Sequence, residues 1–239
     1  MIRYELEGGN LPVVICDPEV GQTLCCQSGA MSWMSPNMSM QTTAGGFKKA
    51  LGRMFTGESI FLNEYSPSGG SYGLIAFASS FPGSIVPFEL KGEGLIVQKH
   101  SFLAMEKGLD LSVWFQKRFS HGFFGGEGFI LQRVSGFGTV FLEIDGYCKE
   151  YNLGVGESLI LDTGYLAAMS DTCTMDVLPV KGAKNIFFGG EGLFHTRVVG
   201  PGKVYVQSMP VINTARALAP YLQINSGSDS GGINIKLGD

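Results

Sequence analysis

Apolar and polar residues alternate over many short stretches of the chain. Between residues 140 and 145, for example, Val140, Leu142 and Ile144 occupy every second position. Because successive side chains of a strand point to opposite faces, this period of two predicts a strand with one buried face. Such runs are short and are separated by glycine-bearing segments. The sequence therefore predicts an all-β protein with few and short helices.

One motif occurs three times, each time at the start of such a run. It reads MFTGES at residues 54–59 and FFGGEG at residues 123–128 and 187–192. Each copy is followed by an apolar run, a glycine-bearing turn and a second apolar run. The two runs cover residues 60–62 and 73–77 after the first copy, 129–131 and 138–142 after the second, and 193–195 and 202–206 after the third. Two runs joined by a turn predict a β-hairpin, here repeated three times.

A second motif precedes the first in each repeat. It begins with a glycine followed by Gln or Glu, at Gly21, Gly92 and Gly156, and continues into two short apolar runs. Two motifs that recur in one order at similar offsets predict three copies of one unit. We call them units 1, 2 and 3, and they cover about residues 21–90, 91–154 and 155–212.

The three units are expected to form one body. A unit of about 65 residues buries too little apolar surface to be secure alone, so the units should share a core. We expect a single domain over residues 1–225, most simply a compact pseudo-threefold body, with a linear stack as the alternative. A short helix is predicted at residues 213–219, before Pro220. Residues 226–239 are rich in Gly and Ser and are expected to form a flexible tail.

Composition narrows the class of protein. Of the 239 residues, 44% are hydrophobic and 16% are charged, which indicates a globular chain. The net charge of -4 gives no general attraction to nucleic acid or anionic membrane, and leaves a local basic patch open. Five cysteines without CxxC spacing argue against a disulfide framework or zinc knuckle. The start lacks a signal-peptide core and no apolar stretch could span a bilayer, so we expect a cytoplasmic protein.

The residues that usually carry catalysis are scattered. His100, His121 and His195 have no metal-ligand spacing, and no nucleophile, phosphate-loop or dinucleotide-binding motif is present. Cys25 and Cys26 lie in an apolar run without a nearby cation, which favours buried structural thiols. The sequence predicts no catalytic residue, no metal and no cofactor, and therefore a protein that is not an enzyme.

The first motif places one glutamate in each unit, at Glu58, Glu127 and Glu191. Around a threefold axis these carboxylates would form a ring and would repel one another unless protonated or bound to a cation. The simpler interpretation is a turn whose Glu faces water or accepts bonds from backbone N–H groups. The matching positions of the second motif differ in residue type, which weakens any charge-based role; they are Gln22, Glu93 and Glu157.

Basic residues cluster in the segments between the motifs. In a pseudo-threefold body they would share one rim, which could bind phosphate, an acidic lipid headgroup or an RNA backbone. No aromatic-interleaved RNA-reading motif accompanies them. The rim would consist of Lys48, Lys49, Arg53, Lys117, Arg118, Lys181 and Lys184.

The FFGGEG motif with its apolar run, its weaker upstream copy, and the run GESLILDTG at residues 156–164 resemble the altered-inheritance-of-mitochondria 24 family over about residues 2–222. The resemblance implies an all-β fold similar to that of the tryptophan RNA-binding attenuation protein (TRAP-like, of the double-stranded β-helix type), repeated within one chain. Family members occur in bacteria and archaea, and fungal members are mitochondrial and linked to inner-membrane organisation. No catalytic residue comes with the resemblance. The start of the chain is unlike a transit peptide, so we expect a prokaryotic cytoplasm.

Three hypotheses about function follow. The leading one is a non-enzymatic scaffold or interaction protein that associates with itself or another protein through exposed sheet edges or flat faces. The alternative is a binding module for an anionic partner, RNA or acidic lipid, which would use the basic linkers. The third is a protein that binds a metal or small ligand through the repeated carboxylates.

Overall fold

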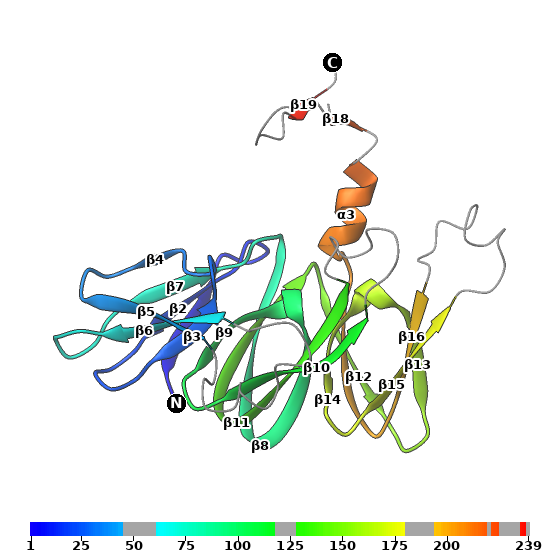
Figure 1. The fold of residues 1–239 in the computed structure, drawn as a ribbon, viewed down its shortest axis with the longest axis horizontal. Helices are drawn as coiled ribbons and strands as arrows, with labels where there is room; N and C mark the ends of the chain where they lie inside the picture. Colours follow the sequence, from blue (N-terminus) through cyan, green and yellow to red (C-terminus); the bar gives the residue numbers. More distant parts are fainter. Residues whose placement is uncertain (45–60, 118–127, 180–193, 219–220, 225–234, 238–239) are drawn as a thin grey trace.

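The computed structural model describes residues 1–44, 61–117, 128–179, 194–218, 221–224 and 235–237. Figure 1 shows that these residues are almost entirely β-structure, which confirms the predicted class. One α-helix, α3 (Val211–Leu218), and two 3-10 turns, η1 (Lys99–Ser101) and η2 (Thr163–Tyr165), interrupt the strands. Of the described helices, none is long and apolar enough to cross a membrane.

The strands of the first part of the chain are β1 (Arg3–Glu7), β2 (Val13–Asp17), β3 (Leu24–Gln27), β4 (Trp33–Met34), β5 (Met38–Ala44), β6 (Phe61–Pro67) and β7 (Ile75–Ala78). The middle part contains β8 (Gly83–Gln98), β9 (Phe102–Glu106), β10 (Asp110–Lys117) and β11 (Phe129–Asp145). The last part contains β12 (Cys148–Leu153), β13 (Ser158–Asp162), β14 (Leu166–Ser170), β15 (Thr174–Pro179), β16 (Phe194–Val199), β17 (Gly202–Gln207), β18 (Leu222–Ile224) and β19 (Ile235–Leu237).

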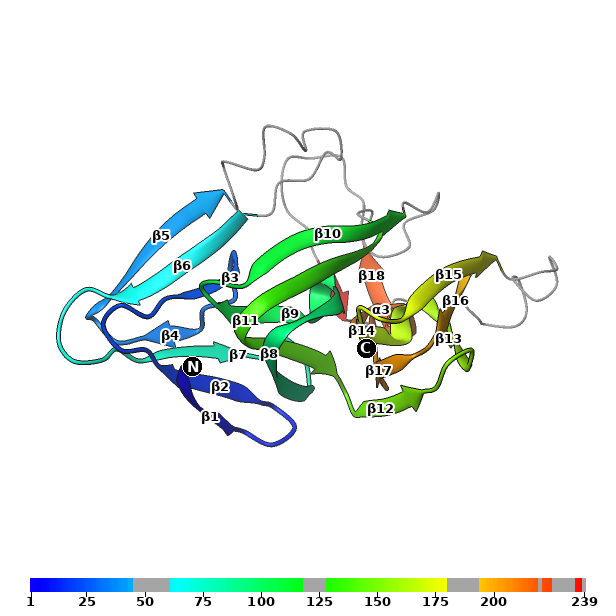
Figure 2. The same ribbon diagram turned by 90° about the horizontal axis from the view of Figure 1, so that it is seen from below.

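The strands form open sheets and no closed barrel among the described residues. The largest sheet has the order β12-β17-β14-β8-β11-β9-β3-β6-β5, with β10 paired to β11, and runs through the whole body. A sheet of order β1-β2-β7-β4 lies at one end and a sheet of order β13-β16-β15 at the other. Figures 1 and 2 show the early strands and the late strands at opposite ends of the long axis. The described strands are thus spread along the long axis of the molecule.

The same pairings recur in each third of the chain. β3 pairs with β6 as β8 pairs with β11 and β13 with β16, always antiparallel. β5 pairs with β6 as β10 with β11 and β15 with β16. β4 pairs with β7 as β9 with β11 and β14 with β17. The register agrees as well, since Cys25, Ile96 and Ile160, each four residues after the glycine of the second motif, face Glu64, Arg133 and Arg197 respectively.

The hairpins lie elsewhere than predicted. Residues 129–142, expected to be two strands and a turn, belong to the single strand β11. β6 and β7, like β16 and β17, are consecutive but belong to different sheets. Glycines with positive φ lie within these segments: Gly136 and Gly202 have φ of 120° and 147°, and the register of β11 shifts beside Gly136. Within the three units, the consecutive strands that pair antiparallel are β5–β6, β10–β11 and β15–β16.

Three clusters of buried side chains form the core. One contains Phe77 and Phe141, the next Val97 and Leu142, and the third Ile96. Neighbouring positions of one strand thus feed different clusters, as Phe141 and Leu142 do, because β11 has a core on both faces. The central cluster contains buried residues from all three thirds of the chain, among them Cys25, Leu142 and Ala167.

The predicted C-terminal helix is confirmed, and it begins two residues earlier than expected, at Val211. The N–H group of Val211 donates to the carboxylate of Asp145, 2.7 Å away, which satisfies one donor of the first turn. In the segment expected to be a loose tail, Ile235–Leu237 forms β19 and pairs with β18.

Candidate functional site

Most residues of the two predicted sites lie outside the described part of the chain. Of the basic rim, only the backbone of Lys117 is described, at the end of β10 opposite Phe129. The rest are Lys48, Lys49, Arg53, Arg118, Lys181 and Lys184. The repeat-marking glutamates Glu58, Glu127 and Glu191 also lie outside it. The prediction that these residues gather on one surface therefore stays a prediction.

The second motif forms a capped turn in all three units. Gln22, Glu93 and Glu157 each accept a hydrogen bond from a backbone N–H group two or three residues earlier; the donors are Glu19, Lys91 and Gly154, at 2.8, 3.1 and 2.7 Å. The preceding glycines have φ of 95°, 110° and 78°, values that favour glycine. These side chains are engaged in holding the turns at the start of β3, the second half of β8, and β13.

The described thiols are poorly suited to chemistry. Burial raises the pKa of Cys16 and Cys26 to about 12 and that of Cys25 to about 11. At neutral pH such groups are almost entirely the unreactive thiol. Among the described residues, no group of three or more His, Cys, Asp and Glu side chains could hold a metal ion.

Two junctions join the three units, and both are built in the same way. β3 of unit 1 pairs with β9 of unit 2, and the second half of β8 in unit 2 pairs with β14 of unit 3. The two junctions have the same register. At each, the residue four positions after the second-motif glycine of one unit faces the residue thirteen positions after the second-motif glycine of the next unit. These central pairs are Cys25 with Met105 and Ile96 with Met169. All four side chains are at most 4% exposed.

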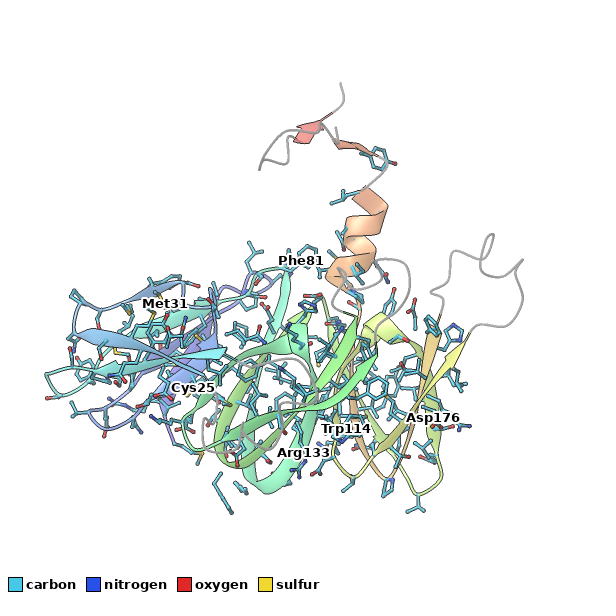
Figure 3. All side chains as sticks on the ribbon, in the orientation of Figure 1. Cys25, Met31, Phe81, Trp114, Arg133 and Asp176 are labelled. Atoms are coloured by element: carbon cyan, nitrogen blue, oxygen red, sulfur yellow. The ribbon has the colours of Figure 1, made fainter. Side chains whose placement is uncertain are left out.

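Each junction also carries one ion pair and one backbone bond outside the strands. At the first, Lys107 donates to Glu64 over 2.7 Å, and its N–H group donates to the carbonyl of Thr23. At the second, Arg133 (labelled in Figure 3) donates to Asp171 over 2.7 Å, and the N–H group of Asp171 donates to the carbonyl of Gly94. Glu64 and Arg133 occupy equivalent positions of β6 and β11, so the charge is reversed while the contact is kept.

The strands of the junctions belong to two series of equivalent strands: β3, β8 and β13 form the first series, and β4, β9 and β14 form the second. Within the described residues, one strand of each series has an open edge. β3, β8, β9 and β14 each have a strand on both sides, whereas β4 pairs only with β7 and β13 only with β16. An open edge presents unpaired N–H and C=O groups to any strand that approaches. In Figure 1 the two edges lie at opposite ends of the molecule, β4 beside the first strands and β13 beside the last.

Apolar side chains are exposed on both open edges. Ile160 on β13 is 58% exposed, although the equivalent Ile96 is fully buried. On β4, Trp33 is 47% and Met34 is 36% exposed, although the equivalent Ala104 and Met105 are buried. These two edges are the candidate site. Sequence reasoning predicted exposed sheet edges without naming residues, and no sequence signal distinguishes Ile160 from the buried Ile96.

Comparisons with known proteins agree with the extent of this fold. A protein family described as mitochondrial biogenesis AIM24 matches residues 4–209. The chain is 28% identical to "Uncharacterized protein M6_Spy0233" of Streptococcus pyogenes serotype M6 over 224 residues, which cover 90% of this chain and 88% of that protein. It is also similar to the crystal structure of protein SPYM3_0169 from Streptococcus pyogenes, with a TM-score of 0.75 and 26% identity, covering 93% of this chain and 100% of the other.

Proposed function

Because the chain belongs to the mitochondrial biogenesis AIM24 family, which matches it over residues 4–209, we propose that it is a non-enzymatic scaffold that binds protein through the open edges of β4 and β13. The observation that carries this proposal is the exposure of Ile160, Trp33 and Met34 at positions whose equivalents are buried between units. Apolar side chains on an open edge favour association, since burying them removes apolar surface from water.

The proposal includes the repeat itself. We infer that the chain consists of three copies of one β unit, because the pairings and their registers recur in each third of the chain. A row of units that each bury a face against the next is the architecture of repeat proteins, which commonly serve as extended binding surfaces. A location in a prokaryotic cytoplasm is part of the same proposal, and the streptococcal relative supports the prokaryotic part of it.

Photo-crosslinking in the native cell tests the proposal. A photo-reactive amino acid placed at Ile160 or Trp33 should give a discrete crosslinked protein, whether that is another copy or a different chain. The matched control is Tyr147, which is also exposed but lies in the turn between β11 and β12, and it should crosslink little. Absence of a discrete product at both edge positions, in cells that contain the folded protein, would contradict the proposal.

A second candidate function, binding of an anionic partner, has one observation in its favour. The basic segments connect β5 to β6, β10 to β11 and β15 to β16, which are equivalent pairs. In Figure 2 the arrowheads of β5, β10 and β15 all point to the upper right, so these three strands end in a similar direction. Binding to anionic vesicles or RNA should then fall steeply with salt and disappear when the linker lysines are changed to Gln. Binding that is equal at low and high salt would exclude this candidate.

A further inference from the structure

We propose that the partner of each open edge is a second copy of this chain, with β13 of one copy pairing antiparallel with β4 of the next. This inference rests on the proposed function and specifies its partner. Within one chain, β3 pairs with β9 and the second half of β8 pairs with β14. β13 is the third member of the first series, and β4 is the remaining member of the second. Pairing β13 of one copy with β4 of the next would repeat, between two chains, the contact that joins neighbouring units within one chain.

The two internal junctions predict the register of this contact. Ile160 lies four residues after Gly156, as Cys25 and Ile96 lie four residues after their glycines. Met34 lies thirteen residues after Gly21, in the position of Met105 and Met169. The central pair between copies is therefore Ile160 with Met34. The flanking pairs between copies are Leu159 with Ser35 and Leu161 with Trp33. The equivalent pairs at the first internal junction are Leu24 with Glu106 and Cys26 with Ala104. Those at the second are Leu95 with Ser170 and Val97 with Ala168.

The side chains of the two edges are suited to each other. Met34 keeps the residue type that faces Ile96 in the second internal junction, where both partners are buried. Trp33 is larger than its equivalents Ala104 and Ala168, and its neighbour on the other side compensates for it. Trp33 faces Ala76 of β7, whereas the two alanines face Phe141 and Tyr205. In unit 1 the large residue of this pair lies on β4 and the small residue lies on β7, whereas in the other two units the arrangement is reversed. β4 therefore carries a large apolar side chain at its open edge.

The charges at this contact are already balanced. Arg197 of β16 occupies the position of Glu64 and Arg133, which form ion pairs across the internal junctions. In this chain Arg197 donates to Asp176 (labelled in Figure 3) over 2.6 Å, so a neighbouring copy need not supply a carboxylate.

Pro36 stands at the position of Lys107 and Asp171, and proline has neither a charge nor an N–H group. The contact between copies therefore lacks the ion pair and the extra backbone bond of the internal junctions. It should be weaker than they are, and reversible.

Because β4 and β13 lie at opposite ends of one chain, the contact is head-to-tail. A head-to-tail contact between edges at opposite ends of an elongated chain generates larger rings or open chains. The wild-type protein should therefore show, by light scattering at increasing concentration, masses above that of a dimer of the 25.6 kDa chain. Ile160→Lys places a charge on the open edge and should reduce the mass to that of the monomer. Tyr147→Lys, at an exposed site outside β4 and β13, should leave it unchanged.

Site-specific crosslinking tests the register. In a Cys148→Ser background, Ile160→Cys protein is mixed with Met34→Cys protein and treated with a short bifunctional maleimide. We expect a crosslinked pair in the mixture and little in either protein alone. Trp33→Cys is the matched control, because neighbouring strand residues point to opposite faces, and it should react poorly with Ile160→Cys.

Three outcomes would overturn the inference: a wild-type protein that stays monomeric at high concentration, equal crosslinking of Ile160→Cys protein with itself, or no effect of Ile160→Lys on the mass. If Ile160 crosslinks in the cell to a different protein while the purified chain stays monomeric, the scaffold proposal stands and the second copy is excluded. If neither edge position crosslinks anything in the cell, the scaffold proposal itself fails.

Discussion

Ile96 and Ile160 offer a matched comparison, because they are the same residue at the same position of successive units. Ile96 is fully buried between β11 and β14, whereas Ile160 is 58% exposed beside an open edge. Removing a fully buried Ile side chain costs about 2–5 kcal/mol, from lost burial and the cavity left behind. An exposed substitution away from special features costs within about 0.5 kcal/mol. Ile96→Ala should therefore destabilise the chain several times more than Ile160→Ala.

The free energy of unfolding of the two variants can be measured by urea denaturation at low protein concentration, where copies stay apart. For a chain of this size, about 1 kcal/mol corresponds to a shift of about 2–4 °C in Tm, so Ile96→Ala should lower Tm by roughly 4–20 °C. The slope of the transition should be checked, because a row of units can lose two-state behaviour. Equal losses for the two variants would refute the argument, because they would mean that Ile160 is already buried in the isolated chain.

Three further predictions concern the interior and the junctions. Exchanging the charges of the Lys107–Glu64 pair, whose members are partly exposed, should restore most of the roughly 0.2–1 kcal/mol lost in either single reversal, and a double-mutant cycle in urea measures this. Burial raises the pKa of Glu143 despite the hydrogen bonds that its carboxylate accepts from Ser79 and Ser80. The contribution of Glu143 to stability is therefore present below the ordinary carboxyl pKa and is lost as pH rises through the folded pKa. Glu143→Gln should flatten that part of the curve of unfolding free energy against pH. With thiol pKa values of about 11 to 12, Cys16, Cys25 and Cys26 should react with a disulfide reagent at pH 8 only on unfolding, and rapid labelling of the native chain at these residues would contradict their burial.

Sequence patterns predicted the class of fold and the helix near the C-terminus, and the family resemblance is confirmed over residues 4–209. The burial of Cys25 and Cys26 was also correct, because an apolar run without nearby cations is a local property. The path of β11 was not predictable in the same way. Gly136 and Gly138 are compatible with a reversing turn or a bulge, and which one forms depends on the strands that pair on either side.

The open edges show a second limit of sequence reasoning. The runs around Ile96 and Ile160 are nearly identical, LIV and LIL, and each predicts a strand buried on both sides. Among the described residues, Ile96 has a strand of the next unit beside it and Ile160 has none. Burial at such a position is set by the neighbour in space, so the sequence of one unit cannot distinguish an internal junction from a chain end.

Pro36 provides the sharpest test of how the internal and external junctions differ. Pro36→Ala restores an N–H group at the position where Lys107 and Asp171 donate to the preceding unit. One backbone hydrogen bond contributes about 0.5–1.5 kcal/mol, so the contact between copies should become about 2- to 12-fold tighter. Pro36→Asp adds a carboxylate facing Arg197, as Asp171 faces Arg133; because Arg197 also donates to Asp176, the further gain should lie toward the lower end of the about 0.2–1 kcal/mol of a surface ion pair.

Salt separates the two contributions, because screening weakens an exposed ion pair and leaves a backbone hydrogen bond largely unchanged. The concentration at which copies associate, measured by light scattering, should fall for both variants at low salt. At high salt the advantage of Pro36→Asp over Pro36→Ala should disappear, while the advantage of Pro36→Ala over the wild type should remain. If neither variant changes the association of a chain that keeps its wild-type melting temperature, Pro36 does not lie opposite β13. The continuation of the internal junctions from copy to copy would then be wrong.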